Sequence, residues 1–121
     1  MDGKQIATVL EVIDGDTIDV NVGTVFFGMC LSTNIRVRFA KIDAPEVHGQ
    51  EAEMGMKTKE WLKERIQGQH IYLDLHGKDK YGRYLADVYT MNNEDVGQEM
   101  LQAGLVELYS AAHHNDGVLE K

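Results

Sequence analysis

Alternation between apolar and polar residues is the strongest pattern in the chain, and it predicts strands along much of its length. A strand presents successive side chains to opposite faces, so its apolar residues recur with a period of two. The alternating segments are residues 6–13, 18–22, 35–39 and 71–75, followed by YLADVYT at residues 84–90. A turn of sequence Lys-Asp-Lys-Tyr-Gly, residues 78–82, separates the last two segments, so we expect them to form a hairpin.

Two other segments, residues 51–67 and 95–103, repeat their apolar residues at the helical spacing of 3.6. Gly68 and Gly104 follow them and are suited to helix ends. The predicted inward stripe of the longer helix is Ala52, Met56, Leu62 and Ile66. The predicted inward residues of the shorter helix are Val96, Met100 and Ala103. Trp61 lies nearly opposite the first stripe, so we expect it to be half-exposed or packed on a neighbouring loop.

Three strands, a helix, a hairpin and a second helix predict an α+β fold, mainly β, with the form of a small closed or partly open barrel carrying attached helices. No repeat, low-complexity tract or linker-like change of composition divides the 121 residues. We therefore expect one domain at residues 1–110 and a loose tail at residues 111–121, which lack a periodic pattern.

Charge and composition restrict the classes of function. The formal net charge of −8 argues against nucleic-acid binding, because nucleic-acid binders usually present a basic face. Bound divalent metal and locally clustered arginines would overcome this objection, since nearby charges set the field at a site. No apolar run is long enough to span a membrane. The sequence begins without a secretory signal, which indicates a cytoplasmic protein as written, or a secreted one if a leader was removed.

Two residue types that often form sites give little signal here. Cys30 is the single cysteine, so an intrachain disulfide is excluded, and we expect a small buried hydrophobic residue. The histidines, His76 among them, are expected to be solvated.

The stretch IDGDT, residues 13–17, has two interpretations. Asp-Gly between apolar runs is a strong turn signal, since aspartate also stabilises turns through the backbone. Asp14 and Asp16 could also hold a cation. By itself the stretch favours a plain turn, and a metal site needs further charged residues in support.

Two later stretches supply such residues. RVRFAKIDAPE carries Arg38, Asp43 and Glu46, and GKDKYGRYLA carries Arg83. Each alone also fits a solvated strand face or a charged hairpin loop. The residue numbers of Arg38 and Asp43 differ by an odd number, so a regular strand would place them on opposite faces, and the strand must bend or bulge if both are to meet one ligand. Pro45 favours such a bend.

Together the three stretches contain what metal-assisted phosphoryl transfer requires. Carboxylate oxygens hold Ca²⁺ or Mg²⁺, and a carboxylate can position or deprotonate water. Guanidinium groups neutralise the charge that builds on a phosphate during the reaction.

Five motifs, in order, resemble the staphylococcal nuclease (thermonuclease) family. They are IDGDT at 13–17, RFAKIDAPE at 38–46, GQEA at 49–52, DKYGRYLA at 79–86 and LQAGLVELY at 101–109. The resemblance covers most of the chain. It implies an OB-fold, a five-stranded barrel with two or three attached helices. It also implies a Ca²⁺-dependent endonuclease that hydrolyses phosphodiester bonds of DNA and RNA and leaves 3′-phosphate and 5′-hydroxyl ends.

Carried over position by position, the resemblance implies three sets of site residues. The implied calcium ligands are Asp16, Asp43 and the backbone carbonyl of Ala44. The implied catalytic residues are Arg38, Glu46 and Arg83. The implied substrate contacts are Lys80, Tyr81 and, by an approximate match to base-stacking tyrosines, Tyr109. In these roles Glu46 would orient and deprotonate water, and the two arginines would grip the scissile phosphate.

The chain departs from the family's secreted type member in two places. GTVFFGMCLSTN, residues 23–34, lengthens the segment between Asp16 and Arg38 and predicts an extra hairpin or lip near the site. After Glu46 only Val47 and His48 precede the helical segment, which removes a lysine-rich surface loop. With the acidic net charge, this favours single-stranded substrate over tight binding of long duplex DNA.

Two other functions remain open. A non-catalytic barrel could bind single-stranded nucleic acid or a protein partner, but it would not need acidic side chains at Asp16, Asp43 and Glu46. A calcium-binding structural domain would have no use for Arg38 and Arg83. For the nuclease we expect a monomer with nucleic acid as substrate, no membrane association and no obligate protein partner.

Overall fold

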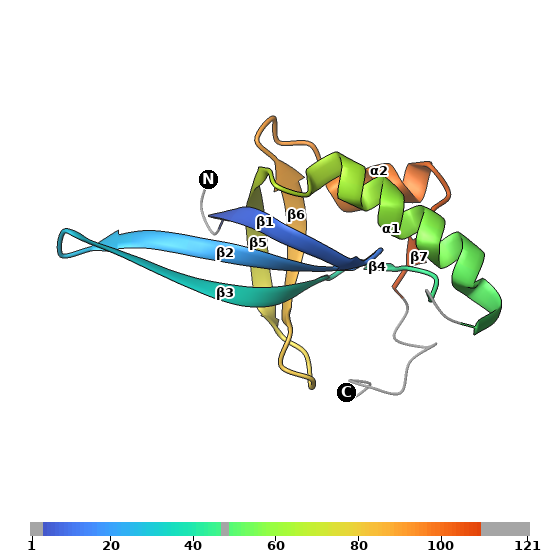
Figure 1. The fold of residues 1–121 in the computed structure, drawn as a ribbon, viewed down its shortest axis with the longest axis horizontal. Helices are drawn as coiled ribbons and strands as arrows, with labels where there is room; N and C mark the ends of the chain where they lie inside the picture. Colours follow the sequence, from blue (N-terminus) through green and yellow to red (C-terminus); the bar gives the residue numbers. More distant parts are fainter. Residues whose placement is uncertain (1–3, 47–48, 110–121) are drawn as a thin grey trace.

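A computed structural model describes residues 4–46 and 49–109 and confirms the predicted barrel (Figure 1). The barrel strands are β1 (Lys4–Asp14), β2 (Thr17–Phe26), β3 (Met29–Phe39), β5 (His70–Lys78) and β6 (Tyr84–Thr90). They close in the order β1-β2-β3-β6-β5. β3 and β6 run parallel, and the other neighbouring strands run antiparallel. This is a mainly β, OB-type arrangement, as the sequence predicted.

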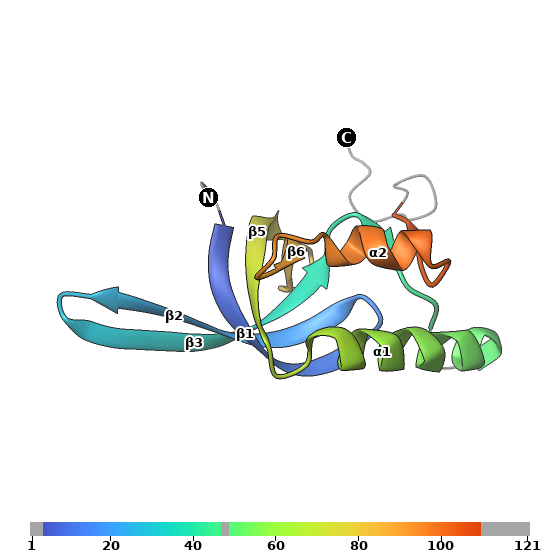
Figure 2. The ribbon, with the colours of Figure 1, turned by 90° about the horizontal axis from the view of Figure 1, so that it is seen from above.

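Short elements and two α-helices complete the fold. They are β4 (Ile42–Asp43), the 3₁₀ helix η1 (Gly49–Glu51), α1 (Ala52–Ile66), α2 (Val96–Gln102) and β7 (Glu107–Leu108). Both α-helices lie on the side of the barrel away from the β2–β3 hairpin tip (Figures 1 and 2). None of the described helices is long and apolar enough to cross a membrane. The expected tail at residues 111–121 lies outside the described residues.

The core forms where the inward side chains of the barrel meet the two helices. Fully buried strand residues include Val9, Val12, Ile18, Val20, Val37, Ile71, Leu73 and Val88. α1 adds Leu62 and Ile66, and α2 adds Val96 and Met100. Each such side chain contributes roughly 1.5–3 kcal/mol by leaving water. The alternation along the strands therefore encodes the barrel interior.

The buried face of α1 differs from the predicted stripe. Leu62 and Ile66 are buried as predicted, but Met56 is 45% exposed. Gly55 and Thr58 take inward positions, because this part of the helix lies against the turn at Gly15, where only small side chains fit. Trp61 is partly exposed, as expected, but it packs against the edge of the core. The inward position predicted for Ala103 is wrong, because α2 ends at Gln102 and Ala103 is exposed.

The insertion at residues 23–34 forms the outer part of a long β2–β3 hairpin. β2 and β3 pair from Thr17 with Arg38 to Phe26 with Met29. The expected hairpin is therefore present, but the expectation that it lies near the site is wrong. Its tip is at the far end of both strands from Arg38 (Figure 1). The expectation for Cys30 is also wrong, since this thiol is exposed on the hairpin.

Candidate active site

The Asp14-Gly15-Asp16 segment is a tight turn joining β1 to β2, because Asp14 pairs directly with Thr17. Gly15 is required by packing. A Cβ atom at this position would lie 2.5 Å from Cγ2 of Thr58 and 2.9 Å from Cβ of Ala44. Such distances are shorter than any normal contact, so the turn lies close against α1 and the segment after β4.

Asp16 joins this turn to the end of β3 and to β4, and only 9% of the residue is exposed. Its Oδ2 accepts a 3.0 Å hydrogen bond from the amide of Ala44, and its Oδ1 accepts one of 3.0 Å from the hydroxyl of Thr17. Its backbone carbonyl accepts a 2.9 Å bond from the amide of Phe39. The Ala44 amide and the Thr17 hydroxyl thus hold the Asp16 carboxylate in place.

Arg38 lies between two carboxylates and is nearly buried. One terminal nitrogen, Nη2, donates to Oδ1 of Asp43 at 2.9 Å and lies 3.5 Å from Oδ2 of Asp16. The other, Nη1, donates to the carbonyl of Phe39 at 2.9 Å. β3 ends at Phe39, and the chain bends before β4 begins at Ile42. This bend brings Arg38 and Asp43 together, as the odd separation required.

A C-terminal segment completes one side of this cluster. β7 pairs with β4, and the amide of Tyr109 donates to the carbonyl of Lys41 at 2.8 Å. The Tyr109 ring consequently lies 5.1 Å from Cζ of Arg38, within cation–π range. The structure therefore brings Asp16, Arg38, Asp43 and Tyr109 together from three separate stretches of the chain.

Arg83 belongs to the loop between β5 and β6, where Asp79 fixes it. Nε of Arg83 donates to Oδ2 of Asp79 at 2.7 Å, while Oδ1 accepts from the amides of Tyr81 and Arg83 at 2.9 Å. Burial alone would raise the pKa of Asp79, but the hydrogen bonds from Arg83 and Tyr81 outweigh it and lower that pKa below its usual value. The loop is thus held by one ionised carboxylate.

Strand register places Arg83 beside the strand that carries Arg38. β3 and β6 are parallel, with Val37 opposite Tyr84, the residue that follows Arg83. In the described part of the chain, the terminal nitrogens of Arg83 donate no hydrogen bond. They remain able to bind an incoming anion.

Tyr81 lies at the tip of the same loop and is 69% exposed. Nζ of Lys80 and Cζ of Arg83 each lie 5.4 Å from the centre of its ring. The loop therefore presents an aromatic ring and two cations close to one another, which is the combination that contacts bases and phosphates in single strands.

Glu46 stands apart from the acidic pair. It is exposed, and its amide donates to Oε1 of Glu51 at 3.2 Å. Its carboxylate has no partner among the described residues. Asp16, Asp43 and Glu46 do not form a compact three-carboxylate group. A water-positioning role for Glu46 would thus require bound substrate or metal to bring the groups together.

The donors at Asp16 and Asp43 fit a hard divalent cation. Both carboxylates contact Nη2 of Arg38, and together with the carbonyl of Ala44 they would offer oxygen donors of the kind that binds Ca²⁺. The guanidinium of Arg38 offsets only one of the two negative charges of this pair, and about a third of the Asp43 side chain is open to solvent. A cation could therefore reach the pair from the Asp43 side.

A second group of potential metal ligands was missed by the sequence interpretation. Ligand atoms of Asp74, His76 and Asp87 lie within 4.8 Å of one another on β5 and β6. His76 contacts Asp87 at 3.0 Å and is not simply solvated, and Lys41 contacts the same oxygen at 3.1 Å. The Asp87 hydrogen bond raises the pKa of Lys41. Lys41 thus supplies the positive charge at this group.

Comparisons of the sequence with a family model and with individual proteins agree with one another. Residues 36–121 match the model of the family described as "Staphylococcal nuclease homologue". The chain is 32% identical over 111 residues to an "Uncharacterized endonuclease" of Escherichia coli, covering 92% of this chain and 65% of that protein. It is 31% identical over 115 residues to an "Uncharacterized endonuclease" of Haemophilus influenzae, covering 93% of this chain and 57% of that protein.

A fungal protein gives a shorter match. The "Probable endonuclease LCL3" of Colletotrichum graminicola is 40% identical over 83 residues, which cover 64% of this chain and 30% of the fungal protein. The alignments with the bacterial relatives span somewhat less than two thirds of those proteins' own length.

Proposed function

This chain belongs to the staphylococcal nuclease family, and from that membership we propose that it is a Ca²⁺-dependent endonuclease. Its substrates are DNA and RNA, with single strands preferred, and its products carry 3′-phosphate and 5′-hydroxyl ends. One observation carries the proposal: Arg38 lies between Asp16 and Asp43, beside the strand that begins just after Arg83. A binding module would need no such combination of paired carboxylates and guanidiniums.

Asp16, Asp43 and the carbonyl of Ala44 would hold the calcium ion. Bound there, Ca²⁺ would supply positive charge to a phosphate oxygen as a Lewis acid. Asp16 is suited to this role, because hydrogen bonds from Thr17 and from the Ala44 amide orient its carboxylate before any ligand arrives.

The protein's own groups would carry the reaction as follows. Glu46 orients a water molecule and accepts its proton as the oxygen attacks phosphorus. The bond from phosphorus to the 5′ oxygen breaks, and that oxygen leaves and takes up a proton from solvent, while Glu46 later releases its proton to solvent. Arg38 and Arg83 bind the equatorial oxygens, whose charge rises during the displacement. The free terminal nitrogens of Arg83 suit this bidentate contact.

The neighbouring nucleotides would contact the β5–β6 loop and Tyr109. Lys80 and Tyr81 bind an adjacent phosphate, and Tyr109 stacks on a base. With a net charge of −8 and few cations, binding depends on local contacts that salt weakens. A flexible single strand can bend to reach these groups, whereas duplex DNA presents a rigid phosphate array.

The experiment is cleavage of an end-labelled single-stranded oligonucleotide by the purified chain. Parallel reactions contain Ca²⁺, Mg²⁺ or chelator, and the products are tested for 3′-phosphate and 5′-hydroxyl ends. We expect cleavage with Ca²⁺, much less with Mg²⁺ and none with chelator. We also expect duplex of the same sequence to be cut more slowly. Equal cleavage in chelator contradicts the calcium assignment, and binding without cleavage would support the non-catalytic alternative.

A further inference from the structure

The outer part of the β2–β3 hairpin, residues 23–34, projects from the barrel as a two-stranded ribbon, which we call the ribbon (Figures 1 and 2). β1 accompanies β2 only as far as Val22, and β6 pairs with β3 only from Val37 onward. Among the described residues, neither strand of the ribbon pairs with any strand other than its hairpin partner. An isolated pair of strands is at best marginally stable in water, and unpaired edges tend to associate.

The ribbon carries a concentration of exposed apolar side chains. The exposed fractions are 69% for Val25, 55% for Phe26, 87% for Phe27, 54% for Met29 and 46% for Leu31. Val25 pairs with Cys30 and lies on the opposite face from Phe26, Met29 and Leu31. Phe26, Phe27, Met29 and Leu31 expose roughly 450 Å² of apolar surface, comparable with the largest patch on a typical monomer, which is often functional. Phe26, Met29 and Leu31 share one face with Val22, because Phe26 pairs with Met29 and Thr24 with Leu31.

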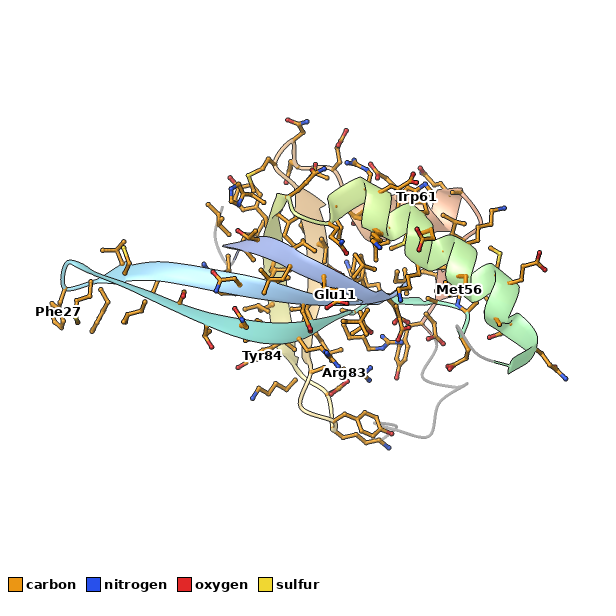
Figure 3. All side chains as sticks on the ribbon, viewed as in Figure 1. Glu11, Phe27, Met56, Trp61, Arg83 and Tyr84 are labelled. Atoms are coloured by element: carbon orange, nitrogen blue, oxygen red, sulfur yellow. The ribbon has the colours of Figure 1, made fainter. Side chains whose placement is uncertain are left out.

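The turn at the tip gives a second, independent sign that the patch has a function. Phe27 and Gly28 form the two-residue turn, with φ of +54° and +76°. A left-handed backbone suits Gly, Asn or Asp and disfavours a bulky residue. The chain nevertheless has an aromatic residue there, with its ring 4.4 Å from that of Phe26 and directed away from the barrel (Figure 3). A phenylalanine in this left-handed conformation strains the backbone, and the strain is explained if a partner buries the Phe27 ring.

We propose that the partner is a second copy of this chain, and that two ribbons associate about a two-fold axis through their apolar faces. No charged residue occurs between Asp19 and Arg36, so two copies with a net charge of −8 each can approach along this stretch with little repulsion. In a two-fold dimer the same surface of each copy contacts the equivalent surface of the other, so an apolar face can be covered by its own counterpart. This departs from the monomer expected from the sequence, and it does not depend on the nuclease activity.

Two other partners fit the ribbon less well. Insertion into lipid would bury the unpaired edges of both strands in hydrocarbon, where unsatisfied backbone groups are costly. Nucleic acid would require cations near the apolar ring pair, and residues 20–35 contain none. When two ribbons associate through their apolar faces, the unpaired backbone groups along the strand edges remain in contact with water at the border of the interface.

The area is sufficient for a modest dimer. Two such faces bury at most roughly 900 Å² in total, which is the size of weak, transient interfaces, so we expect a dissociation constant in the micromolar range. Aromatic side chains dominate the energy of such interfaces, and their removal weakens association by about 30-fold or more.

Sedimentation equilibrium of the full chain, with reductant present to keep the exposed Cys30 reduced, tests the proposal. At about 100 μM we expect twice the 13.6 kDa chain mass, falling toward the monomer on dilution. The variant F26T/F27N/L31T should stay monomeric, and Phe27→Asn alone should weaken the dimer without disturbing the fold, because asparagine suits the left-handed turn.

The matched control replaces exposed apolar residues away from the ribbon. Met56 and Met91 are each 45% exposed, and the variant M56Q/M91Q should dimerise like the parent. A parent chain that remains monomeric at 100 μM overturns the proposal. So does a dimer whose dissociation constant is unchanged in Phe27→Asn and in F26T/F27N/L31T, or ribbon-dependent binding of the monomer to phosphatidylcholine vesicles.

Discussion

Asp79 holds Arg83 with both of its carboxylate oxygens: Oδ2 accepts from the guanidinium Nε at 2.7 Å, and Oδ1 accepts from the Arg83 amide at 2.9 Å. The guanidinium is therefore fixed through one edge, which leaves its terminal nitrogens for a ligand. A group that is already oriented in this way loses less entropy when it binds a phosphate.

The first prediction concerns this contact. Asp79→Asn removes the negative charge and replaces one carboxylate oxygen, which accepts a hydrogen bond, with an amide NH₂ group, which cannot. The guanidinium of Arg83 should then be held less firmly in its present position. We expect the kcat of cleavage to fall about 10- to 100-fold with a smaller change in KM, because misplacing a group that stabilises the transition state affects mainly the barrier.

The control for this prediction is the pair of Asp19 and Arg36, which has a similar 2.8 Å contact on the outer surface of β2 and β3. Asp19→Asn should leave the kinetic constants close to those of the parent, since exposed ion pairs contribute little. If Asp79→Asn is as active as Asp19→Asn, Asp79 does not position Arg83 for catalysis.

The second prediction tests why glycine occurs in the Asp14–Asp16 turn. Gly15→Ala would place Cβ 2.5 Å from Cγ2 of Thr58, and we expect it to destabilise the fold by about 1–3 kcal/mol through overpacking. Thr58→Ser removes that methyl group and keeps the hydroxyl that donates to the carbonyl of Leu105. Thermal unfolding of G15A/T58S should recover part of the loss. Equal melting temperatures for Gly15→Ala and the parent would contradict the close packing.

The third prediction is a pH dependence of stability. The pKa of Asp79 is lowered in the folded chain, so its ionised form contributes stability above the unfolded pKa of about 3.9, and this contribution is lost as pH falls through the folded pKa. Urea unfolding should show the parent more stable than Asp79→Asn by a constant margin between about pH 5 and 7. The margin should shrink below about pH 4. A margin that persists undiminished at the lowest pH contradicts the ionised contact.

The fourth prediction concerns the proposed calcium ligands. Ca²⁺ at 100 times its dissociation constant should stabilise the chain by about 2.7 kcal/mol, visible as a higher melting temperature. Asp43→Asn should abolish most of this shift, and the apo protein should lose some stability as well, because the Arg38 side chain is only 10% exposed and loses one of its two charged partners. An undiminished calcium shift in this variant would place the ion elsewhere, and the group of Asp74, His76 and Asp87 would be the next place to test.

Much of the barrel could be predicted from the sequence because alternation is a local property. The bend between Arg38 and Asp43 was also predicted, on the condition that both residues serve one site, because a regular strand would send them to opposite faces and Pro45 favours a bend. The resemblance to a family then indicated which charged residues to compare, although their chemical roles remain predictions.

Other features depend on how distant segments dock. The rotation of α1 follows from the contact between Gly15 and Thr58, which no periodicity encodes, so Met56 was wrongly placed inward. The cluster at Asp87 depends on the register of β5 and β6, which pairs it with Asp74. The direction of the 23–34 hairpin follows from the unbroken pairing of β2 with β3, and it carries Cys30 into solvent.

The most direct test of the nuclease account is the single-turnover cleavage rate of Glu46→Gln in saturating Ca²⁺. Glu46 is exposed and its carboxylate supports no contact among the described residues, so the variant should melt with the parent and show the same calcium shift. The account predicts a rate about 100- to 1000-fold below that of the parent, because water positioning acts at the barrier. A rate close to that of the parent, with folding and calcium binding intact, would contradict it.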